Sequence, residues 1–138
     1  MADENKIVVV GVDGSTESTQ ALQWAADFAD RVGADLLLVT AWQWPMSYGA
    51  PVYWPAFNPD GEARSVVEKA HASVTLQHGE VRTAVHEGKP GPVLVDLAQH
   101  AAALVVGSQG HGAVAEAVLG SVSAYCVRHA HCPVVVVR

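Results

Sequence analysis

Five apolar runs alternate with four segments of helical periodicity, and this alternation is the strongest constraint on the fold. The runs cover residues 7–12, 36–41, 81–85, 104–106 and 134–137, and most of them are continuous. Continuous runs rich in Val, Ile and Leu are typical of strands covered on both faces, as in a parallel sheet. Between them, apolar residues recur at helical spacing over residues 21–32, 63–74, 93–98 and 114–125. Right-handed crossovers then predict one α/β domain over residues 1–138, with an open, doubly wound five-stranded parallel sheet and helices on both faces.

Capping and helix-breaking residues support these boundaries. Ser15 or Thr16 can cap the first helix, and Pro92 suits the first turn of the third. We expect the first, second and fourth helices to end at Gly33, Gly79 and Pro133, respectively.

One segment, residues 42–60, does not fit the repeat. It lacks clear periodicity and holds four prolines and six of the nine aromatic residues. Because it follows the second strand, it emerges at the carboxyl edge of the sheet, where ligands bind in such folds. Two interpretations stay open: its rings seal the top of the core, or it serves as a lid or a partner surface.

Composition and charge argue against several function classes. The formal net charge of -6 and the lack of a Lys/Arg cluster argue against a nucleic-acid partner. Without a long apolar stretch or a basic, apolar leader, we expect no membrane role and a cytoplasmic protein.

The spacing of Cys126 and Cys132 fits neither a redox pair nor a zinc knuckle, so both are expected to be reduced thiols. We expect His129 and His131 to be helix-end residues and not metal ligands.

Two strand ends carry the residues that suggest chemistry. The first strand ends in Gly-Val-Asp-Gly-Ser at 11–15, and the fourth ends in Gly-Ser-Gln-Gly-His-Gly at 107–112. In a doubly wound sheet these ends can be neighbours at the topological switch point, where a crevice opens. Asp13 is placed to accept hydrogen bonds from the two hydroxyls of a ribose. The alternative is that Asp13 caps the following helix or fixes the turn at Gly14.

The glycines after the fourth strand suggest an anion site. Gly107, Gly110 and Gly112 allow close approach, so that successive backbone N–H groups can converge on a phosphate. Nine residues separate Gly110 from Gly120 and Ser121, and the Ser121 hydroxyl can join those amides. Together with Asp13, these residues predict a nucleotide site.

The spacing G-x-x-G, nine residues and then G-S resembles the motif of the ATP-binding subgroup of universal stress proteins. The chain matches it at residues 107–110 and 120–121, and the likeness extends from the Gly-Val-Asp-Gly-Ser sequence at 11–15 to the valine run at 134–137. The resemblance covers essentially the whole chain. It implies a Rossmann-like sheet in the order 3-2-1-4-5, ATP as the ligand, with or without Mg²⁺, and a homodimer formed through the last strand, Val134–Val137.

The resemblance also implies roles for individual residues. Asp13 would hold the ribose of the adenine nucleotide. The adenine pocket would be lined by Gly11, Ala41 and Val106. The phosphates would lie on Gly107, Ser108, Gln109, Gly110, His111, Gly112, Ala113, Gly120, Ser121, Val122 and Ser123.

Two positions depart from the family pattern. Gln109 and His111 stand where the family often carries Arg or Lys beside the glycines. Fewer fixed positive charges weaken the attraction for the γ-phosphate, which leaves the preference for ATP over ADP or AMP open. His111 can donate a hydrogen bond to phosphate, more strongly when protonated; alternatively, it faces solvent.

Three functions are compatible with these sequence features. The first is a module that holds ATP as a regulatory or structural ligand. The second is a slow ATPase or autophosphorylating protein that uses Ser121, Ser123 or His111. The third is a nucleotide-free scaffold that acts through residues 42–60. The glycine motif favours the first two over the third, and the absence of the lysine and Mg²⁺-binding hydroxyl of a P-loop favours the first over the second.

Overall fold

A five-stranded parallel sheet forms the centre of the molecule, in the order β5-β2-β1-β6-β7. The computed structural model describes residues 6–52, 58–109 and 119–138. Its main strands are β1 (Ile7–Gly11), β2 (Asp35–Trp42), β5 (Val81–Glu87), β6 (Ala103–Gly107) and β7 (Val134–Val137). The five strands correspond to the five apolar runs, and the predicted order 3-2-1-4-5 is confirmed.

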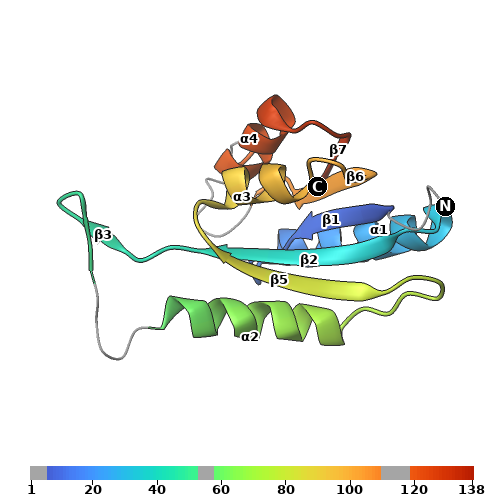
Figure 1. Cartoon of the computed structure of the whole chain (residues 1–138), viewed down its shortest axis with the longest axis horizontal. Helices are drawn as coiled ribbons and strands as arrows, with labels where there is room; N and C mark the ends of the chain where they lie inside the picture. The colour runs from blue at the N-terminus through green and yellow to red at the C-terminus, as the bar shows by residue number, and fades with distance from the viewer. Residues whose placement is uncertain (1–5, 53–57, 110–118) are drawn as a thin grey trace.

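Helices cover the sheet on both faces, as predicted. α1 (Thr16–Val32) and α2 (Pro59–Ala72) lie on one face, and α3 (Pro90–Leu97) and α4 (Ser121–His129) lie on the other. Figure 1 shows α2 below the sheet and α3 with α4 above it. This arrangement follows from the strand order, since right-handed crossovers to the left and to the right of β1 place their helices on opposite faces.

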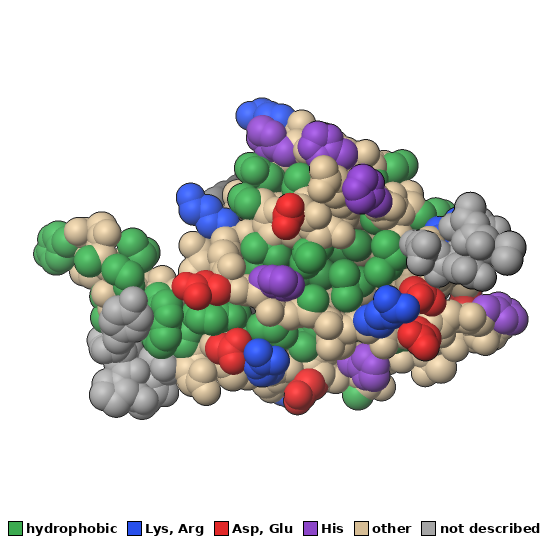
Figure 2. Space-filling view, viewed as in Figure 1, with side chains coloured by type: hydrophobic (Ala, Val, Ile, Leu, Met, Phe, Trp, Pro, Cys, Tyr) green, Lys and Arg blue, Asp and Glu red, His purple; other side chains and the backbone are tan. Residues whose placement is uncertain are grey.

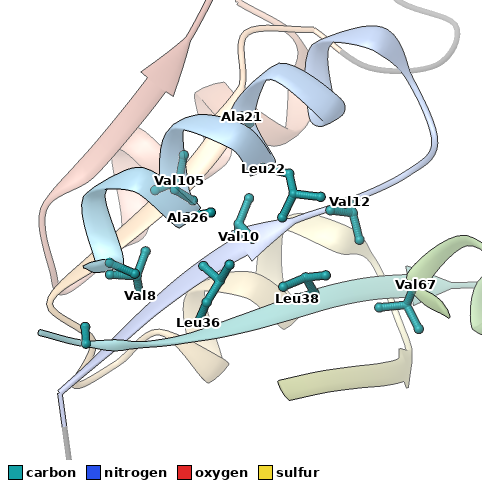
Figure 3. Packing of buried hydrophobic residues seen from close by; sticks show 13 residues of the cluster. Val8, Val10, Val12, Ala21, Leu22, Ala26, Leu36, Leu38, Val67 and Val105 are labelled. Carbon is teal, nitrogen blue, oxygen red and sulfur yellow. The ribbon is translucent and has the colours of Figure 1, made fainter. Parts of the chain in front are cut away.

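Each face has its own hydrophobic core. On the α1 face, Val8 and Val10 of β1 lie with Leu36 and Leu38 of β2 in one core beneath α1 (Figure 3). On the α3 face, Val9, Leu104 and Val106 are buried with Leu94 and Cys126. Neighbouring residues of one strand thus enter opposite cores, which explains why β1 and β6 are apolar along their whole length.

The two predicted caps of α1 are present. Ser15 is the N-cap, and its side chain accepts a hydrogen bond of 3.2 Å from the backbone N–H of Ser18. Gly33 ends the helix with φ of 70°, a left-handed conformation in which a Cβ is unfavourable. Pro92 lies in the first turn of α3, as expected. This helix begins at Pro90.

Two boundaries differ from the sequence-based expectations. α2 ends at Ala72 with Ser73 as its C-cap, so Gly79 does not end it. Gly79 serves a different purpose, because a Cβ there would lie 2.5 Å from the carbonyl oxygen of Ala34. α4 continues past residue 125 to His129 and ends before Pro133, while the predicted start of this helix at residue 114 lies outside the described residues.

The segment between β2 and α2 is partly ordered by a small hairpin. β3 (Met46–Ser47) and β4 (Ala50–Pro51) pair in antiparallel fashion around Tyr48 and Gly49, which have φ of 51° and 77°. Sequence periodicity could not reveal strands of two residues. The hairpin projects away from the body of the molecule at the carboxyl edge of the sheet (Figure 1), and its surface is largely hydrophobic (Figure 2). Tyr48 is fully exposed there.

Candidate functional site

The carboxyl ends of β1 and β6 lie side by side, which confirms the predicted neighbourhood of the two strand ends. Val10 of β1 pairs with Val105 of β6 in the parallel register. After these strands the chain leaves toward opposite faces, to α1 after β1 and to α4 after β6. This divergence is the topological switch point at which ligands bind in open α/β sheets.

Asp13 lies in the turn between β1 and α1 and is exposed. Its Oδ1 accepts a hydrogen bond of 2.9 Å from the backbone N–H of Ser15, and its own N–H donates to the hydroxyl of Ser18 at 3.3 Å. The local turn-forming role weighed for this residue is therefore present. The same turn holds the carboxylate at the carboxyl edge of the sheet.

Two glycines of the predicted site lie against neighbouring helices. A Cβ on Gly107 would lie 2.9 Å from the backbone carbon and oxygen of Glu17, so the first turn of α1 approaches the end of β6 closely only because this residue is glycine. A Cβ on Gly11 would lie 2.9 Å from Cδ1 of Leu94 on α3. These glycines bring both helical layers close to the switch point.

Hydrogen bonds fix the start of α4 to the end of β6. The N–H of Gly120 donates to the carbonyl of Ser108 at 2.6 Å, and the hydroxyl of Ser123 lies 2.9 Å from the same oxygen. Ser108 in turn donates its N–H to Val137 of β7 at 2.9 Å. Ser123 is 1% exposed, so its hydroxyl holds the first turn of α4 in place from inside the protein.

The remaining predicted residues differ in burial, and four of them lie outside the described part of the chain. Val106 is buried in the core beneath the switch point, while Ala41 is half-buried in β2, opposite His86 of β5. Gln109 is half-buried at the last described position after β6. Gly110, His111, Gly112 and Ala113 lie outside the described residues.

A pocket of about 280 Å³ opens between the first turns of α3 and α4 and the end of β2. Two predicted phosphate ligands, Ser121 and Val122, line it. The other lining residues were missed by sequence analysis: Gln43, Lys89, Pro90, Gly91, Pro92 and Tyr125. One signal was available, because Gly-Lys-Pro-Gly-Pro at 88–92 directly follows the third predicted strand, whose carboxyl end lies at the same edge of the sheet.

The pocket combines apolar walls with a positive rim. Pro90, Pro92, Val122 and Tyr125 supply apolar surface, and a Cβ on Gly91 would lie 2.7 Å from the ring of Tyr125, so glycine allows this close contact. Neither α3 nor α4 has a side-chain cap or an acidic residue in its first turn. Because Pro90 and Pro92 carry no N–H, the first turn of α3 offers the N–H of Gly91, and α4 offers those of Ser121 and Val122, at the pocket that Lys89 also lines.

Burial raises the pKa of the Cys126 thiol to about 11, and the nearby Cys132 adds to this shift. Burial also raises the pKa of Cys132, which is half-buried. Both cysteines are free. A thiol with a raised pKa is a poor nucleophile and a poor metal ligand at neutral pH, so these residues belong to the core and not to the site.

Comparisons with known proteins place the chain among well-defined relatives. Residues 4–138 match the universal stress protein family. A universal stress protein of Mycobacterium tuberculosis is 37% identical over 143 residues, which cover 95% of this chain and 47% of the relative. The chain thus spans about half the length of the curated relatives it matches.

Solved structures agree with this assignment. A universal stress protein in complex with cAMP is 33% identical, with a TM-score of 0.62, and the match covers 96% of each chain. The universal stress protein UspA from Lactobacillus plantarum is 23% identical with a TM-score of 0.80, over 96% of this chain and 97% of that one, and supports the fold. In the described part of the chain, no helix combines the length and apolar character needed to cross a bilayer.

Proposed function

The chain belongs to the universal stress protein family, and on this premise we propose that it binds an adenine nucleotide, ATP in particular, as a regulatory or structural ligand. One observation carries the proposal: Ser121 and Val122, which end the glycine motif, line a pocket between two uncapped helix N-termini. Such N-termini favour a bound anion. The 33% identical relative solved with cAMP supports an adenine nucleotide as the ligand class.

Each part of the nucleotide has a candidate partner. The exposed carboxylate of Asp13 accepts hydrogen bonds from the ribose hydroxyls, and residues Gly11, Ala41 and Val106 provide the apolar strand ends beneath the adenine. The phosphates lie on the backbone N–H groups of residues 107–113 and 120–123, with the Ser121 hydroxyl as a further donor. Because the Ser123 hydroxyl is held by Ser108, we assign to Ser123 only a backbone contact. Mg²⁺ would enter with the phosphates.

Dimerisation through β7 belongs to the same proposal. β7 is an edge strand that pairs with β6 on one side, and all four of its valines are half-buried. An edge of this kind can be covered by the same strand of a twofold-related copy. We expect a dimer at micromolar concentration by light scattering, and a monomer there would refute this part. The proposed location is the cytoplasm, where two free cysteines remain reduced.

The nucleotide proposal is tested by identifying what the purified protein retains. The protein is denatured, the released small molecules are separated by chromatography, and added ATP is then followed over hours with and without Mg²⁺. Intact, bound ATP is the expected result. Accumulating ADP would instead identify a slow ATPase, and the absence of any adenine nucleotide binding would overturn the proposal.

Asp13→Asn sharpens this test. The amide oxygen of asparagine can still accept from the N–H of Ser15, so the turn before α1 is retained while the charged ribose acceptor is lost. We expect a loss of ATP affinity of roughly tenfold, on the scale of one charge-assisted hydrogen bond. Asp96→Asn, on the exposed side of α3, serves as the matched control and should bind ATP like the unmodified protein.

A further inference from the structure

The glycine loop carries Gln109 and His111 where a fixed cation would be expected, yet the pocket contains a lysine from another loop. We propose that Lys89 contacts the phosphates of the bound nucleotide and sets a preference for nucleotides with two or three phosphates. This inference rests on the proposed function and names its specificity-determining residue. The Lys89 ammonium, which follows β5, would supply the positive charge that Gln109 and His111 do not provide after β6.

The backbone at Lys89 is held firmly at the edge of the site. The preceding Gly88 has φ of 144° and donates its N–H to the carbonyl of Trp42 at 2.8 Å, which ties the end of β5 to the end of β2. Lys89 then forms the N-cap of α3, and its carbonyl accepts from Val93 at 3.1 Å. The side chain is exposed and lines the same pocket as Ser121 and Val122 of α4. A rigid base thus presents a flexible ammonium to the predicted phosphate site.

Lys89 is not where helix stability would place a cation. A lysine at the N-cap offers no acceptor to the N–H of Gly91, which is the one N–H that Pro90 and Pro92 leave in the first three helical positions. Its charge also opposes the helix dipole. Within residues 6–52, 58–109 and 119–138, no ion pair involves Lys89, whereas Arg64 pairs with Asp60 and Arg82 with Asp35. An anionic ligand in the pocket would compensate both the lysine and the two helix N-termini.

The chemistry of the ammonium selects phosphate over the other parts of a nucleotide. A lysine is a compact, flexible point charge with three donors, well suited to follow phosphate oxygens. Its attraction grows with ligand charge. Lys89 should therefore contribute most to ATP and ADP, less to AMP, and little to adenosine.

The test is a calorimetric titration of the full chain with ATP, ADP, AMP and adenosine. We compare the unmodified protein with Lys89→Gln, Lys89→Arg and the control Lys69→Gln, since Lys69 lies on α2, on the opposite face of the sheet. We expect Lys89→Gln to weaken ATP binding about tenfold while adenosine affinity changes less than about twofold. Lys89→Arg should keep most of the affinity, and Lys69→Gln should bind like the unmodified protein.

The outcomes separate the inference from the proposed function. If the unmodified protein binds the nucleotides and Lys89→Gln weakens adenosine as much as ATP, or weakens neither, the role of Lys89 is overturned and nucleotide binding stands. If the unmodified protein binds none of the four ligands, both fall. Thermal unfolding of each variant confirms that the compared proteins are folded, and Lys89→Gln is expected to unfold at a temperature no lower than the unmodified protein because its helix loses an unfavourable charge.

Discussion

The two helical layers treat their N-termini in opposite ways. In the layer of α1 and α2, Ser15 and Asn58 cap the helices with their side chains, and acidic residues occupy both first turns. In the layer of α3 and α4, Lys89 and Gly120 provide no side-chain cap, and no acidic residue follows. The first layer caps its own helices, whereas the second leaves the N–H of Gly91 in α3 and those of Ser121 and Val122 in α4 without a side-chain cap. The difference locates the proposed site more sharply than the glycine motif does.

The largest expected effect concerns the glycine that joins the layers. Gly107→Ala should lower the free energy of unfolding by about 2 to 3 kcal/mol, because its Cβ would meet the backbone of Glu17, which cannot move without displacing α1. Gly11→Ala is the matched comparison and should cost about 1 kcal/mol, since its Cβ meets only the flexible end of Leu94. Urea denaturation measures both. Equal losses would show that the close approach of α1 to β6 is not what requires Gly107.

The second prediction concerns the core beneath α4. The Cys126 pKa rises from 9.0 to about 11 on folding, so between these pH values the folded state binds more protons than the unfolded chain. The free energy of unfolding should therefore be unaffected by this group below pH 9 and fall as pH rises above it, with a slope approaching about 1.4 kcal/mol per pH unit. Urea denaturation at several pH values should show a flatter dependence for Cys126→Ala. Parallel curves for the two proteins would refute burial of the thiol.

Removing one serine hydroxyl from the first layer and one from the second tests the contrast between the layers. Ser15→Ala should lower the free energy of unfolding by about 1 kcal/mol, because the cap of α1 is lost. Ser121→Ala, in the first turn of uncapped α4, should change stability by less than about 0.5 kcal/mol and weaken ATP binding instead. Urea denaturation gives the free energy of unfolding of each variant, and calorimetric titration gives its affinity for ATP. A Ser121→Ala protein that is as destabilised as Ser15→Ala, with unchanged ATP affinity, would contradict the assignment.

Much of this architecture could be predicted because it depends on local pattern. Apolar runs, most of them continuous, indicated all five strands of the sheet, and Ser15 and Gly33 marked both ends of α1. Gly79 was misinterpreted because its reason is a close approach to Ala34, which is distant in sequence. The hairpin at Met46–Ser47 and Ala50–Pro51 was missed because strands of two residues have no measurable period.

The candidate site divides in the same way. Asp13 and Ser121 could be placed at the carboxyl edge from the strand ends and the motif. The packing roles of Gly107 and Gly11 and the inward hydroxyl of Ser123 depend on tertiary contacts that spacing does not encode. The sequence places Lys89 at this edge, after the third predicted strand, but the pocket that it shares with Ser121 and Val122 depends on how α3 packs beside α4, which spacing does not encode.

Backbone amide chemical shifts during an ATP titration test most directly whether the uncapped layer binds the nucleotide. The N–H of Gly91 and those of Ser121 and Val122 should shift and saturate together, while the N–H of Gly61, already bonded to Asn58 at the start of α2, should not move. Saturable shifts at the α3 and α4 N-termini, at the turn that holds Asp13 and at the strand ends and glycines of the proposed site are the predicted result. Saturable shifts elsewhere with unmoved Gly91, Ser121 and Val122 would contradict the account.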